Sequence, residues 1–343
     1  MKMLTTENTE DTETKTTRGP LISIPCFPCL PWFKLPAALA AFLLMLTPML
    51  AAETNGLGTR DARLQTLVEE TFAATLKEFS AKKLLTNQLA ITLVDVRAAT
   101  QLKHGSTRGG VAIYPASVVK MFYLAATHRW LEDGQLTDTA ELRRAMKDMI
   151  VDSNNDATAY ILDLLTGTTG GPELPEAEMK AWGEKRNAVN RYFTALGYTN
   201  INANQKPWNE GPYGRERAWV GEKFGNRNLL TTDATARLLT EIALGRCVSA
   251  KRSAEMMALH ARDLTAPGEA DDQARGFSAG GLPRAAKLWS KAGWTSRARH
   301  DAACIELADG RRFVVVVFTE GHANERGVIP ALVRRIIAGV GSR

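Results

Sequence analysis

Ser117 and Lys120 are the residues of this chain whose types and spacing best suit nucleophilic chemistry. They lie three positions apart in the run Tyr114-Pro-Ala-Ser-Val-Val-Lys-Met-Phe-Tyr-Leu-Ala-Ala126. A serine hydroxyl needs an adjacent base before it attacks a carbonyl. Side chains at i and i+3 of a helix share a face, about 5–6 Å apart at Cβ. Pro115 suits the position ahead of a helix start, and the apolar run after Lys120 predicts a buried helix.

Chance supplies the same spacing elsewhere in the chain. Ser80-Ala-Lys-Lys83 repeats it at the polar end of a predicted surface helix, with no apolar helix behind it. We interpret that copy as a solvated face. The pair at 117 and 120 therefore depends for its meaning on the elements that position it and on further partners.

The elements around the pair follow from hydrophobic periodicity. A helix is predicted over residues 61–83, a strand over 89–96, and a turn at Gly109-Gly110 with a short strand at 111–113. Helices are then predicted over the ranges 117–132, 138–151, 156–165 and 176–196, and another from Thr231. The chain closes with strands at 286–290, 302–307 and 313–319 and a helix at 328–340.

The simplest arrangement of these elements builds one sheet from both ends of the chain. The predicted fold class is α/β (α+β), with a five-stranded antiparallel sheet flanked by helices and a separate all-helical lobe. One domain is expected over residues 53–343, with the sheet lobe at about 60–115 and 285–343 and the helical lobe at about 116–284. Long polar loops within 166–228 suggest a lid over a site.

Composition is that of an ordinary globular protein: 343 residues, 45% apolar, 23% charged, with a net charge of +6. Lys and Arg are scattered without a run of five, so no nucleic-acid partner is expected. The five histidines form no metal-binding pattern, and we expect no metal and no cofactor. Cys247 and Cys304 are expected to be unpaired buried thiols. We expect a monomer that acts on a small molecule or a cell-wall peptide.

Residues 1–52 are interpreted as a targeting segment. Residues 35–52 combine a basic flank, a short apolar stretch and small residues at the end, which is typical of a secretory signal. Pro36 and Pro48 weaken this stretch as a membrane span, although an uncleaved N-terminal anchor stays open as an alternative. The segment predicts an exported protein, periplasmic or extracytoplasmic.

Two further motifs give the Ser117 pair its partners. Ser153-Asn154-Asn155 lies in a break between predicted helices, and Lys291-Ala292-Gly293 ends a predicted strand ahead of a hairpin. With Ser117-Val-Val-Lys120 first in order, the chain resembles the penicillin-recognising serine hydrolases. More narrowly it resembles the class A β-lactamases, whose motifs are S-x-x-K, S-D-N and K-T-G. The resemblance covers about residues 60–340.

This resemblance implies catalytic roles for four side chains. Ser117 would attack an amide or ester carbonyl, and Lys120 in its neutral form would take the hydroxyl proton. Ser153 would pass a proton to the leaving nitrogen. Asn155 would hydrogen-bond the substrate's side-chain amide and steady Lys120.

It also implies roles along the strand that carries the third motif. Lys291 would attract a substrate carboxylate. The backbone N–H of Trp294 would form the oxyanion hole together with that of the nucleophile. Gly293, Thr295 and Ser296 would contact the substrate.

Two departures from the family pattern bear on function. Ala292 replaces a hydroxyl residue that would hold the substrate carboxylate, for which Thr295, Ser296, Arg297 or Arg299 are candidate substitutes. Asn154 replaces Asp, which is expected to be tolerated.

The third departure concerns release of the acyl group. No E-x-x-L-N motif occurs within residues 156–230, and Glu210 is the nearest candidate for the deacylating base, ahead of Glu216 and Glu222. The expected function is an exported serine hydrolase that forms an acyl-enzyme at Ser117 and hydrolyses the β-lactam amide. The alternatives are a D-alanyl peptidase or penicillin-binding protein, another esterase or amidase, and a non-catalytic binding module with the same fold.

Overall fold

A computed structural model describes residues 56–208, 210–266 and 272–341. The predicted targeting segment at 1–52 lies outside the described residues. Among the helices of the described part, none combines the length and the apolar character that crossing a bilayer demands.

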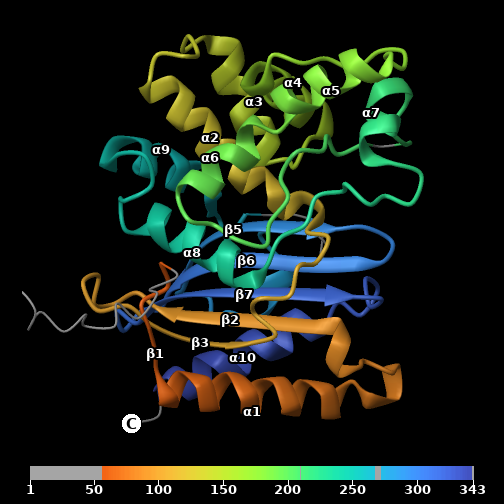
Figure 1. Cartoon of the computed structure of the whole chain (residues 1–343). Helices are drawn as coiled ribbons and strands as arrows, with labels where there is room; N and C mark the ends of the chain where they lie inside the picture. Colours follow the sequence, from red (N-terminus) through yellow and green to blue (C-terminus); the bar gives the residue numbers. More distant parts are fainter. Residues whose placement is uncertain (1–55, 209, 267–271, 342–343) are drawn as a thin grey trace, which may run out of the picture. The chain divides into compact units, whose positions relative to one another are not determined.

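A mixed sheet of seven strands forms the centre of the described part (Figure 1). The strand order is β1-β3-β2-β7-β6-β5-β4. The strands are β1 Thr59–Arg60, β2 Leu89–Asp95, β3 Lys103–Thr107, β4 Ala261–Arg262, β5 Lys287–Trp294, β6 Ala298–Glu306 and β7 Arg312–Glu320. The prediction of five antiparallel strands was wrong, because β1 and β4 extend the edges and β1 runs parallel to β3. Strands of two residues are too short to show an alternating pattern.

The short strand predicted at 111–113 was also misplaced. Ile113 makes a single bridge to Leu230, while β3 lies earlier in the chain. The sequence of β3, Lys-His-Gly-Ser-Thr, lacks apolar alternation, and a side chain at Gly105 would collide with the backbone of Leu64. Close packing against a helix, rather than hydrophobic pattern, determines this strand.

Ten α-helices occur in the described residues. They are α1 Ala62–Glu78, α2 Lys120–Glu132, α3 Ala140–Ile150, α4 Asn155–Thr166, α5 Glu176–Arg186, α6 Ala188–Ala195, α7 Gly214–Val220, α8 Thr232–Ala243, α9 Ala250–His260 and α10 Val328–Gly341. Side-chain caps start five of them, at Asp61, Thr139, Asn154, Thr231 and Ser249. Helices α7 and α9 were not predicted from the sequence.

Apolar cores cover both faces of the sheet. Helices α1 and α10 pack on one face, and α8 with the helical lobe packs on the other (Figure 1). Successive residues of β7, such as Val316 and Val317, belong to the two different cores. Because both faces of this strand are buried, its sequence is a continuous apolar run. The core on the helical-lobe side also contains Cys247 and Cys304 as free thiols, which confirms that prediction.

Candidate active site

Ser117 lies in a tight 3₁₀ turn, Ala116–Val119, that runs directly into α2. Residues i and i+3 of a 3₁₀ turn eclipse one another, so Ser117 and Lys120 leave the turn on the same side. Ser117 is half-buried, and Lys120 is completely buried. Ala116 has φ +46°, a left-handed conformation that persists in a residue with a side chain only when its surroundings enforce it.

Strand β5 and its neighbour β6 enforce this turn. A Cβ added at Gly293 would lie 2.6 Å from the Pro115 oxygen and 2.9 Å from the Ser117 nitrogen, so the backbone of β5 runs against the turn with no room for a side chain. From β6, the Nε2 of His300 donates to the Tyr114 oxygen at 2.9 Å. His300 Nδ1 accepts from the backbone N–H of Thr319 at 3.0 Å, which assigns the Nε2–H tautomer.

Lys120 contacts the second motif rather than solvent. Its Nζ donates to the Ser153 carbonyl at 2.5 Å and to Asn155 Oδ1 at 2.8 Å, and it lies 3.3 Å from Ser153 Oγ. A neutral amine has two N–H groups and one lone pair. The two carbonyl-type acceptors use both N–H groups, which leaves the lone pair for a hydroxyl proton.

Asn154, where the resemblance expects Asp, is the N-cap of α4. Its side chain accepts from the N–H of Ala157 at 2.8 Å. Ser153 just before it has φ +56°, so the break between α3 and α4 turns sharply and presents the Ser153 hydroxyl to two lysines. Asparagine and aspartate cap helices about equally well, which accounts for the substitution.

Lys291 of β5 completes the set from the opposite side. Its Nζ donates to Ser153 Oγ at 2.9 Å, to Gln273 Oε1 at 3.1 Å and to the Ala292 oxygen at 2.7 Å. These three acceptors match the three hydrogens of an ammonium group. One serine hydroxyl is thus shared by two buried lysines.

Gln273 is a component that sequence reasoning missed. Besides Lys291, its Oε1 accepts from the Ala292 N–H at 2.9 Å, and its Nε2 donates to the Val151 oxygen at 2.9 Å. It therefore connects β5 to the segment just before Ser153. A single glutamine in a loop belongs to no motif, so no signal in the sequence marks it.

Burial controls the charge of the two lysines. Loss of solvation lowers the pKa of Lys120 to about 7. Burial also lowers the pKa of Lys291 well below its usual range, as do the charges of Lys120 and Arg262, against the opposite effect of Asp301. Near neutral pH, Lys120 is therefore able to act as a base. For Lys291, the three acceptors around its Nζ favour the ammonium form, against the direction in which burial moves its pKa.

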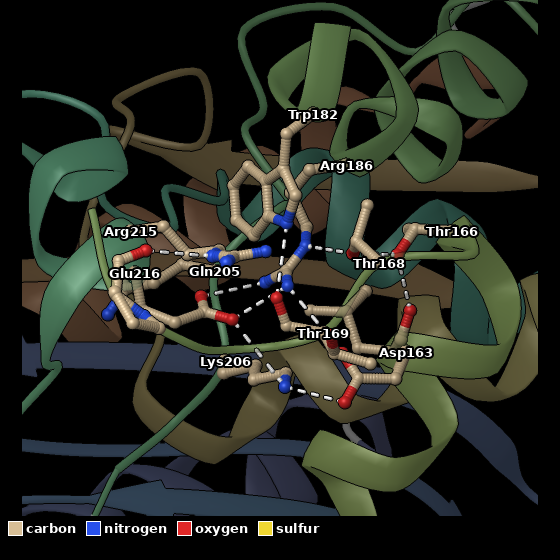
Figure 2. Close-up of polar contacts among 12 residues, drawn as sticks. Asp163, Thr166, Thr168, Thr169, Trp182, Arg186, Gln205, Lys206, Arg215 and Glu216 are labelled. Carbon is tan, nitrogen blue, oxygen red and sulfur yellow. Dashed lines mark hydrogen bonds and ion pairs between the residues drawn. The ribbon is translucent and has the colours of Figure 1, made fainter. Parts of the chain in front are cut away.

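A buried ion network holds the loop that borders Asn155. The Trp208 carbonyl in this loop accepts from Asn155 Nδ2 at 3.2 Å. Figure 2 shows Arg186 of α5 pointing into a group of acidic and hydroxyl side chains, where it forms two hydrogen bonds to Glu216 of α7 at 2.7 and 2.9 Å. Lys206, two residues before Trp208, pairs with Asp163 of α4 at 2.7 Å.

The network contains two cations and two carboxylates, and Arg186 is fully buried. Arg186 also donates to Thr168 and stacks on the Trp182 ring at 4.3 Å. Because the guanidinium is paired and hydrogen-bonded, burying it is tolerated. The network fastens the Trp208 loop to three helices, and sequence reasoning did not predict it.

The structure does not join Glu210 to Ser117 or Lys120. Glu210 is exposed and lines a cavity of about 560 Å³ together with Lys206 and Tyr213. Within the described residues, no hydrogen bond or ion pair joins Glu210 to Lys120 or Ser117. Glu216 is engaged by Arg186, and Glu222 is exposed.

The predicted substrate-binding residues lie just beyond Gly293. Trp294 is the last residue of β5, 45% exposed, and Thr295 and Ser296 form the turn that follows and line a separate cavity. Ala292 is fully buried and packs in the core beneath α1 and α10. The side chain at 292 therefore points into that core.

Comparisons with known proteins cover most of the chain, and the matched family region includes Ser153, Asn155 and Lys291 but begins after Lys120. A family model described as the beta-lactamase enzyme family matches residues 138–338. Among solved structures, a β-lactamase from Sphaerobacter thermophilus is similar at 19% identity, with 79% of this chain and 97% of that chain covered and a TM-score of 0.58. A class A β-lactamase from Bacteroides cellulosilyticus is similar at 15% identity, with 81% and 99% covered and a TM-score of 0.58.

A third similar structure is a mutant of PBP-A in an acyl-enzyme complex with penicillin G, at 15% identity, 80% and 97% covered and a TM-score of 0.56. At these identities, the likenesses establish a β-lactamase-like α/β fold. No curated protein sequence matches the chain.

Proposed function

The chain belongs to the beta-lactamase enzyme family, and we propose from this premise that it is an exported hydrolase that forms an acyl-enzyme at Ser117 and opens the β-lactam amide. One observation carries the proposal. Lys120, Ser153 and Lys291 come from three separate segments and meet in a continuous buried set of hydrogen bonds, and Lys120 directly follows the turn that carries Ser117. Export is supported by the signal-like composition of residues 35–52.

In the proposed reaction, each step uses one named group of this site. The lone pair of neutral Lys120 takes the Ser117 proton as Oγ bonds to the carbonyl carbon, and the N–H groups of Ser117 and Trp294 receive the developing oxyanion. The carbon–nitrogen bond then breaks. Ser153 donates its proton to the departing nitrogen and regains one from the protonated Lys120, which returns the amine to its neutral state. An ester at Ser117 remains, and water must hydrolyse it.

A second candidate shares acylation and differs in release. Within the described residues, Lys120 has no carboxylate partner, and Glu210 faces a different cavity. This arrangement favours slow hydrolysis of the ester, as in a penicillin-binding protein that acts on D-alanyl peptides. The same fold without any acylation would be a binding module.

Intact-mass measurement during incubation with benzylpenicillin separates the candidates. Hydrolysis predicts an adduct that appears and decays with accumulation of penicilloate, and a D-alanyl peptidase predicts a lasting adduct together with release of D-alanine from a D-alanyl-D-alanine peptide. Ser117→Ala must abolish the adduct. Ser80→Ala, at the same S-x-x-K spacing, is the matched control and must keep it. If the wild type forms neither an adduct nor penicilloate, both enzymatic candidates are refuted.

A further inference from the structure

A cavity of about 570 Å³ opens where the Trp208 loop faces the end of β5. Three aromatic side chains line it, from Tyr114, Trp208 and Phe224. Its charged lining comes from Arg227, Arg297 and one carboxylate, Glu320. The cavity thus combines flat apolar surfaces with an excess of positive charge.

Each wall of this cavity is attached to the acylation centre. Tyr114 lies three residues before Ser117, and its carbonyl is held by His300. The Trp208 carbonyl is bound to Asn155. Thr295 and Ser296 continue the chain beyond Trp294, the proposed oxyanion donor. A substrate bonded to the Ser117 hydroxyl therefore has this cavity beside it.

The direction of β5 indicates which part of a substrate enters. Lys291 and Ser153 lie together on one side of Gly293, and Ser153 must face the leaving nitrogen. Thr295 and Ser296 lie on the other side of Gly293 along the strand. Because the leaving group and the acyl group extend in opposite directions from the attacked carbonyl, the acyl side chain points toward the cavity.

Among the described residues, Arg227 is oriented by aromatic rings and not by a carboxylate. Its guanidinium lies 3.6 Å from the Tyr114 ring centroid and 5.9 Å from that of Phe224, and its Nε is buried without a hydrogen-bond partner. Within residues 56–208, 210–266 and 272–341, neither Arg227 nor Arg297 makes an ion pair. Stacking orients the planar group in advance, and a guanidinium binds a carboxylate through paired hydrogen bonds.

We propose that this cavity binds the acyl side chain of the substrate and selects side chains that carry a carboxylate next to a flat apolar group, with Arg227 as the anchor. This inference rests on the proposed function for the identity of the acyl side. The specificity-determining contact is the guanidinium of Arg227, supported by Arg297 at the rim of the cavity.

Two penicillins that differ by one carboxylate provide the test. Carbenicillin carries this group on the acyl side chain of benzylpenicillin, and the second-order rate constant of acylation is measured for both by intact mass. The wild type is expected to favour carbenicillin, and Arg227→Gln to reduce the ratio of the two rate constants roughly tenfold. Lys223→Gln removes the same charge from an exposed position of the same segment outside the cavity and should keep the ratio.

An unchanged ratio in Arg227→Gln, or an equal loss for both penicillins, overturns the proposal. If Arg227→Gln does not fold, the ratio of the two rate constants in Arg297→Gln, a variant of the exposed turn, is judged by the same criterion.

If neither penicillin acylates the wild type, the proposed function fails, and the cavity is tested alone by NMR titration with phenylmalonic monoamide and phenylacetamide. Tighter binding of the monoamide that Arg227→Gln removes supports the cavity assignment, and equal binding of the two amides overturns it.

Discussion

The charge state of Lys120 predicts how acylation depends on pH. Burial lowers the pKa of Lys120 to about 7, so the neutral, basic form makes up roughly 90% of the molecules at pH 8 and roughly 10% at pH 6. If Lys120 takes the Ser117 proton, the second-order rate constant of acylation by benzylpenicillin falls roughly tenfold from pH 8 to pH 6. The rate constant falls toward low pH because acid converts neutral Lys120 into an ammonium that has no lone pair.

Stopped-flow or quenched intact-mass measurements from pH 5.5 to 9 give this profile. Lys120→Arg keeps a cation in place that does not lose its proton, and it should lower acylation by about 10²–10⁴-fold. Lys147→Arg, at an exposed position of α3, makes the same exchange away from the site and should change nothing. A rate that stays flat from pH 6 to 8, or a midpoint near that of an ordinary lysine, refutes Lys120 as the base.

Further predictions concern packing and stability. Glu216→Gln removes the carboxylate that forms two hydrogen bonds with the buried Arg186 and leaves Asp163 as its remaining charge partner, so it should lower the free energy of unfolding in urea by about 3–5 kcal/mol. A loss below about 1 kcal/mol contradicts the buried network. Gly293→Ala places a Cβ 2.6 Å from the Pro115 oxygen and should slow acylation at least roughly tenfold. Gly110→Ala, where a Cβ meets no atom within 4 Å, should leave the rate unchanged. Equal rates in both variants argue against close approach of β5 to the Ser117 turn. Burial lowers the pKa of His128, His260 and His300 to between about 3 and 4. The folded state therefore binds fewer protons than the unfolded chain, and the melting temperature should fall as the pH drops from 6.5 toward 4. A constant melting temperature across this window contradicts the burial of these neutral rings.

Local pattern was sufficient for the elements whose residues alternate or repeat at the period of their structure. Helix α1, strands β2, β6 and β7 and the closing helix α10 lie within a few residues of their predicted positions, because each has an apolar face or is apolar on both faces. Pattern failed for β3, for the two-residue edge strands and for α7, where length or polarity gives no periodic signal.

The sequence by itself determined the chemical inventory: a serine and a lysine one turn apart, with Ser153, Asn155 and Lys291 in a recognisable order. Only the tertiary structure decided that these groups meet, since Lys291 and Ser153 are 138 positions apart. It also separated Glu210 from Lys120 and introduced Gln273 and Arg227. Only the tertiary structure decides the pKa of Lys120 as well, because the removal of solvent depends on every element that surrounds the amine. Spacing along the chain contains no measure of that burial.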